Sequence, residues 1–160
     1  MKRCVVFFGY IACFVLLPLQ IVTALTYIVG RQFFDIPATP LQELEWHLFT
    51  ACVFFTIGFA YLQDRHVRID IVRERLGART RAWIELIGFV IAVLPFCALF
   101  IWQGSVETWA SFVAGERSRA ALGLEYRWVI RATVPLGALL LLIAGILVFQ
   151  RNVKLLRGRI

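Results

Sequence analysis

Two histidines and ten acidic residues are the side chains of this sequence best suited to bind a metal or transfer a proton. His47 and His66 stand 19 residues apart, at opposite ends of one apolar run. If that run is helical, its rise separates them by roughly 28 Å. One copy of the chain cannot then direct both imidazoles to a single haem iron, so we expect no haem.

The positions of the carboxylates do not predict an ion path. Glu43, Glu45, Glu85 and Glu107 all stand within about two turns of the end of an apolar run. An acid deep within a span would mark an ion path, because an unpaired charge in hydrocarbon is costly. The four-span multidrug exporters depend on such an acid. A four-span exporter is therefore a possible function that the sequence disfavours. A membrane anchor of a respiratory enzyme is another, disfavoured because the two histidines cannot share a haem iron.

Catalysis is not indicated by any motif. The sequence contains no glycine-rich phosphate loop and no convergent set of Ser, His and Asp. Its four cysteines have no metal-ligand spacing. We therefore predict that the protein is not an enzyme and needs no cofactor.

The elements that must position these side chains are membrane helices. With 61% hydrophobic residues and a mean hydropathy of +0.79, the chain is too apolar for a soluble domain of 160 residues. Its net charge of +7 lies in clusters between apolar runs, which suits lipid headgroups and not nucleic acid. We predict an all-α integral membrane protein with four transmembrane helices in one domain, residues 1–160. The expected spans are about 5–30, 44–62, 82–109 and 132–150.

The first run is too long for a secretory signal, so we expect it to stay uncleaved, although Val22-Thr23-Ala24 resembles a cleavage site. Pro18 predicts a kink in this helix, and Pro95 predicts a kink, tilt or projection of the third. Gly137 and Gly145 share one helical face, which favours a close helix contact.

Lys and Arg residues predict the orientation. Twelve stand on the side of the termini and the central loop, residues 63–81, against five on the other side. The positive-inside rule then places both termini in the cytoplasm. Residues 69–76 could form a short amphipathic helix on the membrane surface, one of the interfacial helices that we expect.

Three stretches resemble the small membrane subunit, DctQ-like, of tripartite ATP-independent periplasmic (TRAP) transporters. They are Glu43-Leu44-Glu45-Trp46-His47-Leu48-Phe49, Arg65-His66-Val67-Arg68-Ile69-Asp70, and Trp128 followed by Val134-Pro135-Leu136-Gly137. Glu116, Ser118 and Leu122-Gly123-Leu124 also look like the outer loop of that family. Many members have two adjacent acids where this chain has Gln42 and Glu43.

The resemblance implies a non-catalytic subunit of the bacterial inner membrane that braces a large multispanning subunit. That large subunit would hold the sodium and substrate sites for uptake of an organic acid or similar solute. A periplasmic substrate-binding protein would dock on the outer face. Membrane lipids are the remaining partners that we expect, and nucleic acid is not one.

Three groups of residues are the expected contact sites. The interface with the large subunit is predicted at Glu43, Glu45, Trp46, His47, Gly137 and Gly145. A cytoplasmic clasp that holds the second and third spans in register is predicted at Arg65, His66, Arg68 and Asp70. Docking of the binding protein is predicted at Glu116, Arg117, Arg119 and Arg127.

Overall fold

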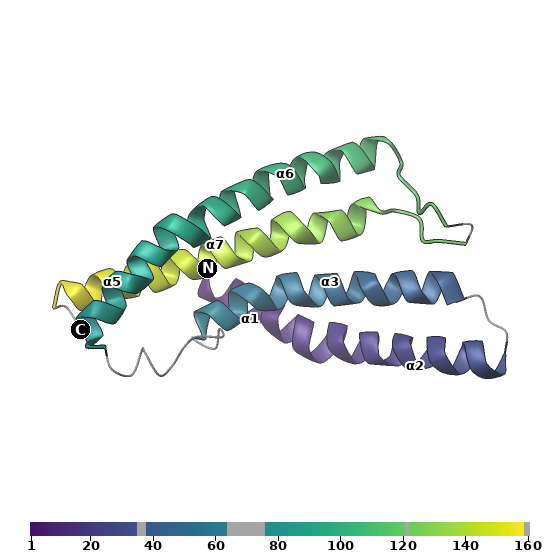
Figure 1. The fold of residues 1–160 in the computed structure, drawn as a ribbon, viewed down its shortest axis with the longest axis horizontal. Coiled ribbons are helices and arrows are strands. Elements are labelled where there is room, and N and C mark those ends of the chain that lie inside the picture. The colour runs from purple at the N-terminus through teal and green to yellow at the C-terminus, as the bar shows by residue number, and fades with distance from the viewer. Residues whose placement is uncertain (35–37, 64–75, 121, 159–160) are drawn as a thin grey trace.

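The computed structural model describes residues 1–34, 38–63, 76–120 and 122–158, and within them the chain forms long helices (Figure 1). Four helical segments are long and apolar enough to cross a membrane. The prediction of four spans in an all-α protein is therefore confirmed.

Each segment extends beyond its predicted span. The elements are α1 (Lys2–Ile11), η1 (Ala12–Leu16), α2 (Leu17–Phe33), α3 (Ala38–Leu62), α5 (Ala78–Gly88), η2 (Phe89–Val93), α6 (Leu94–Val113) and α7 (Trp128–Leu156). The first three form one continuous segment, and so do α5, η2 and α6. The additional turns carry the polar and aromatic residues that flank each apolar run. A bilayer core is only about 30 Å thick, so these turns can lie outside it.

A π-helical turn precedes the proline in each of the two continuous segments. Proline lacks an N–H and its ring crowds the carbonyl four residues earlier. Before Pro18, the Leu17 N–H bonds to the Ala12 carbonyl, and before Pro95, the Leu94 N–H bonds to the Phe89 carbonyl. The widened turn thereby accommodates each proline without ending the helix.

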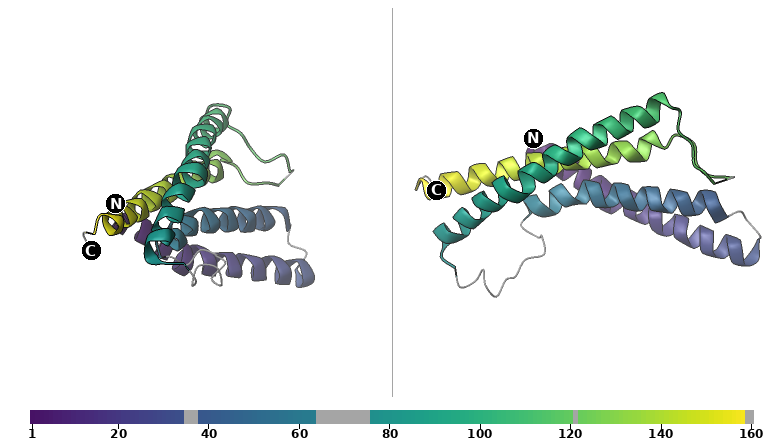
Figure 2. Two further views of the ribbon diagram at one scale, coloured as in Figure 1. Left: turned by 60° about the vertical axis from the view of Figure 1, so that its left-hand side comes forward. Right: turned by 45° about the horizontal axis from the view of Figure 1, so that its top comes forward.

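Side by side, the helices lie in the order α6, α7, α3, α2 (Figure 1). Their direction alternates along the chain, so the neighbours α7 and α3 run the same way and both chain ends lie toward the same end of the molecule. The α6–α7 pair and the α2–α3 pair diverge toward the opposite end, which carries the loop of residues 114–127 (Figure 2). We call residues 114–127, except the undescribed 121, the α6–α7 loop.

Helix α7 is the centre of the packing. Leu140 and Ala144 of α7 form a buried cluster with Val5 of α1, and Phe55 and Phe59 of α3 pack against it. By contrast, α2 and α6 expose large apolar side chains along their lengths, as membrane-embedded surfaces do.

Glycines permit α3 and α7 to approach closely. A β-carbon added to Gly137 would lie 2.6 Å from the Phe54 Cβ and carbonyl oxygen, and one added to Gly58 would lie 2.9 Å from the Leu140 carbonyl oxygen. One added to Gly145 would overlap the ring of Phe89. The predicted close helix contact is therefore present, but it is made within the chain.

Gly137 and Gly145 were also predicted as contacts for a large subunit. Both are buried against helices of their own chain. The predicted clasp and nearly all of the predicted amphipathic helix, residues 69–75, lie outside the described residues.

Candidate functional site

The start of α3 and the α6–α7 loop are joined through one carboxylate. Glu43 lies in the second turn of α3. The Ser118 hydroxyl donates a hydrogen bond to its Oε1, and the Leu124 backbone N–H donates to its Oε2 at 2.7 Å. One side chain of α3 therefore satisfies two donors of a loop that lies 75 to 81 residues further along the chain.

The loop also folds back on itself. The Ser118 N–H donates to the Leu124 carbonyl at 3.1 Å, and the Arg127 N–H donates to the Glu116 carbonyl at 3.2 Å. These two bonds hold the outgoing and returning arms side by side. The loop is thus ordered by its own backbone as well as by α3.

Two positions in the loop depend on their residue type or conformation. A β-carbon on Gly123 would overlap the Ser118 side chain and lie 2.9 Å from Glu43 Oε2. Tyr126 has a φ of 62°, which L-residues seldom adopt. It stands at the entrance to α7, where its carbonyl accepts a hydrogen bond from the Val129 N–H and the N–H of its neighbour Arg127 donates to Glu116. The returning arm therefore follows a specific backbone path.

Charged residues join the loop to both helices that it connects. Arg131 of α7 bonds Glu107 of α6 through Nη1 at 2.6 Å, and Glu116 of the loop through Nη2 at 2.8 Å. Arg127 lies 3.8 Å from Glu116, measured from Nη1 to Oε1. Because the guanidinium of Arg131 binds two carboxylates at once, it holds the ends of α6 and α7 and the loop together.

The pKa of the Glu116 carboxyl is held below its ordinary value. The Ser111 hydroxyl has the largest effect, and the positive charges of Arg131 and Arg127 add to it. The Ser111 hydroxyl is buried and lies close enough to the carboxylate to lower its pKa, although it makes no hydrogen bond of regular geometry with another described residue. Glu116 is consequently charged at neutral pH and pairs with the two arginines.

The outward surface of the loop combines charge with apolar side chains. Arg117 pairs with Glu125 at 3.3 Å, and the two side chains are 72% and 51% exposed. Arg119, Leu122 and Tyr126 are exposed as well. Of the residues predicted for docking, Arg117 and Arg119 are therefore accessible, whereas Glu116 and Arg127 help to fix the loop.

Comparison with known families agrees with this architecture. The family model described as "Tripartite ATP-independent periplasmic transporters, DctQ component" matches residues 20–155. The chain belongs to the DctQ family. No curated protein matches it. It is thus the small membrane component of a TRAP transporter, a non-catalytic protein with four candidate membrane helices.

Family membership confirms the resemblance and the prediction that the protein is not an enzyme. It favours a TRAP transporter component over the exporter and the respiratory anchor. Within the part of the DctQ chain that the structure describes, no group of three or more His, Cys, Asp or Glu residues could hold a metal ion.

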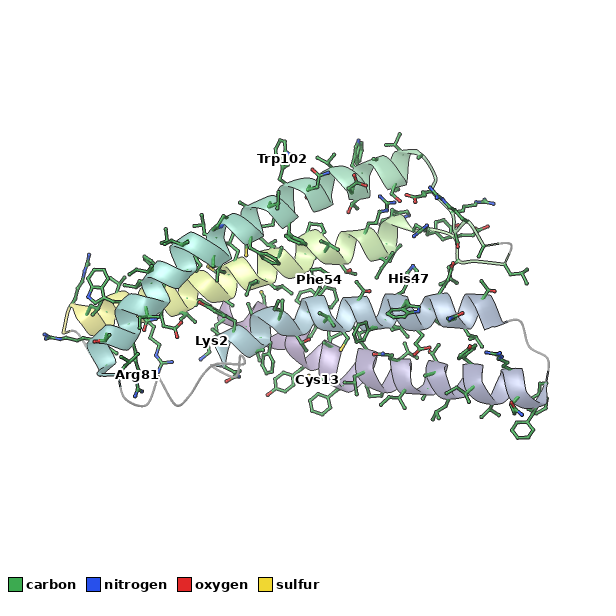
Figure 3. The ribbon with its side chains drawn as sticks, in the orientation of Figure 1. Lys2, Cys13, His47, Phe54, Arg81 and Trp102 are labelled. Atoms are coloured by element: carbon green, nitrogen blue, oxygen red, sulfur yellow. The ribbon has the colours of Figure 1, made fainter. Side chains whose placement is uncertain are left out.

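The structure divides the predicted cluster at the start of α3. His47 lies on α3 (Figure 3), one turn after Glu43. The His47 Nδ1 lies 2.6 Å from the Glu43 carbonyl oxygen, to which it must donate. Trp46 is 63% exposed and stands edge-on to Phe49. Glu43 therefore serves the α6–α7 loop, while Trp46 is available to a partner of this DctQ protein.

Sequence reasoning assigned no role to Glu107 and Arg131, and it did not connect Ser118 or Leu124 with Glu43. A signal was present for the first pair, because oppositely charged residues stand at the end of one predicted span and the start of the next. The contacts of Glu43 had no such signal, since they bring together residues far apart in the chain.

Proposed function

We propose that this DctQ component is the static brace of a sodium-coupled uptake system for an organic acid or similar small solute, and that its α6–α7 loop helps to dock the periplasmic substrate-binding protein. The observation that carries this proposal is the order of the loop. Hydrogen bonds and ion pairs fix it from α3, α6 and α7, while Arg117 and Arg119 stay exposed on its surface.

A loop fixed in advance suits docking, because a partner that binds it does not have to order it. Exposed arginines on such a loop complement an acidic patch on the partner and speed encounter. The brace role is supported by the glycine contacts that hold α3 against α7, and by acids that stand only near the ends of the spans. Ion and substrate sites are then the work of the large subunit.

The orientation that fits this function places both termini in the cytoplasm of a bacterial cell and the α6–α7 loop in the periplasm. The excess of Lys and Arg on the side of the termini supports it. An even number of membrane-spanning helices also places both termini on the same side.

For contact with the large subunit we propose the exposed Trp46 together with Glu45 and His47 of the same turns of α3. An exposed indole at a membrane interface offers a large, rigid contact area. Gly137 and Gly145 are not part of this surface, because α3 and η2 already cover them.

The test is charge reversal on the loop. Arg117→Glu with Arg119→Glu, in a complex of both membrane subunits reconstituted in liposomes, should lower the rate of sodium-driven uptake and weaken capture of the binding protein at least tenfold. The probe is the radiolabelled organic acid that most raises the melting temperature of the binding protein in a ligand screen. The yield of the two-subunit complex should stay unchanged.

A matched control is Arg151→Glu, which reverses a charge in α7 beyond the predicted fourth span, at the end remote from the α6–α7 loop. Unchanged capture with the loop variant would contradict the docking role. Uptake by the large subunit alone, at the rate of the complete complex, would contradict the brace role.

A further inference from the structure

We propose that Glu43 is a positioning residue for the docking surface: its carboxylate holds both arms of the α6–α7 loop, through Ser118 on the outgoing arm and Leu124 on the returning arm, in the conformation that the binding protein recognises. This inference rests on the proposed docking function of the loop. It assigns Glu43 to the loop of its own chain and not to the interface with the large subunit.

The hydrogen bonds are strongest with an acid at this position. The Ser118 hydroxyl and the Leu124 N–H are both donors, and they bond to different oxygens of the same carboxylate. Glutamine has the same shape, but its amide group offers only one acceptor oxygen, so its NH2 group would have to donate to the Ser118 hydroxyl while the oxygen accepts from Leu124. Glu43→Gln therefore replaces two charge-assisted hydrogen bonds by weaker neutral ones without changing the volume.

Ser118 extends the connection into the loop. Its hydroxyl donates to Glu43 and accepts a hydrogen bond from the Ala120 N–H at 3.2 Å. Gly123 lies so close that a β-carbon there would overlap the Ser118 side chain. The Glu43 carboxylate, the Ser118 hydroxyl and Gly123 thus pack closely together.

A second anchor holds the loop from the other side. Glu116 and Arg131 tie its base to α6 and α7, independently of Glu43. Loss of the Glu43 contacts would therefore free the tip of the loop and the parts of both arms next to it, including the backbone between Arg117 and Arg119, but leave the base in place. The helices that pack through Gly58 and Gly137 would not be disturbed.

The experiment uses the purified complex of both membrane subunits and the substrate-loaded binding protein. Glu43→Gln should increase deuterium exchange of the peptide that contains the Leu124 amide about tenfold, and should raise the Kd of docking about tenfold, or 1.4 kcal/mol. Complex yield should be that of the wild type. The matched control is Gln42→Ala, an exposed neighbour, which should change neither quantity.

A double-mutant cycle separates positioning from a general loss of order. Ser118→Ala should weaken docking in the wild type and weaken it less in the Glu43→Gln background, because the two side chains share one hydrogen bond that glutamine makes weaker. Fully additive effects would overturn the proposal. A loss of complex yield with Glu43→Gln would also overturn it, in favour of a contact with the large subunit.

The outcome distinguishes this inference from the docking function. If reversal of Arg117 and Arg119 weakens docking and Glu43→Gln does not, the positioning role is wrong and the docking role stands. If neither change weakens docking, the docking role fails, and so does a positioning role that serves it, whatever the deuterium exchange at Leu124.

Discussion

The crossing of α3 and α7 should not tolerate even one additional methyl group. In Gly137→Ala the new β-carbon would lie 2.6 Å from the Phe54 Cβ, and in Gly58→Ala it would lie 2.9 Å from the Leu140 carbonyl carbon and oxygen. Non-bonded carbon atoms prefer separations of about 3.5 to 4.0 Å. The helices must therefore move apart by up to about 1 Å, since backbone atoms are among those in contact.

The cost follows from two opposing terms. Overpacking of this kind destabilises by about 1 to 3 kcal/mol. Replacing glycine by alanine inside a helix stabilises by up to about 1 kcal/mol. Gly88→Ala isolates the second term, because nothing lies within 4 Å of the β-carbon that it adds. Relative to Gly88→Ala, we expect each of the two crossing variants to lose about 1 to 3 kcal/mol of unfolding free energy.

The assay is equilibrium unfolding of the purified protein in mixed micelles with increasing denaturing detergent, followed by far-ultraviolet circular dichroism. The double variant should lose less than the sum of the single losses, because helices that have already separated admit the second methyl group at lower cost. Crossing variants as stable as Gly88→Ala would refute the close packing of α3 on α7.

Two further predictions concern the loop and the clasp. The folded pKa of Glu116 is lowered from the 4.5 expected in the unfolded chain, so its contribution to loop order should be complete above pH 4.5 and be lost as the pH falls through the lowered value. Deuterium exchange of the loop, corrected for the intrinsic effect of pH, measures this. Glu116→Gln should reduce the dependence without abolishing it, because the Glu43 carboxylate also orders the loop. Asp70→Ala, in the predicted clasp outside the described residues, should reduce co-purification with the large subunit and leave the substrate affinity of the assembled complex unchanged. A lowered substrate affinity at full assembly would contradict the structural role of the clasp.

The two roles proposed for this protein place different demands on its two ends. A brace needs helices that do not shift, and α7 supplies this by packing glycines and small residues against α3 and η2. A docking surface needs a fixed backbone with accessible charge, and the α6–α7 loop combines both. The hydrogen bonds of Glu43 connect the two, because they run from a bracing helix to the docking loop.

Much of this protein was determined by the sequence alone. Four apolar runs predicted four membrane helices, since only a helix satisfies its own backbone in lipid, and the structure confirms them. Three short motifs were enough to indicate the DctQ family, which the family comparison confirms. The basic clusters predicted an orientation that awaits experiment.

Tertiary structure decided which residues meet. The sequence placed Glu43 with Trp46 and Gly137 in one interface, but the helix turn separates Glu43 from Trp46, and the packing of α7 on α3 buries Gly137. Helical periodicity shows which residues share a face of one helix, but not what that face will meet. That depends on how helices distant in sequence cross, and here their arrangement brings the start of α3 beneath a loop that follows it by about 80 residues.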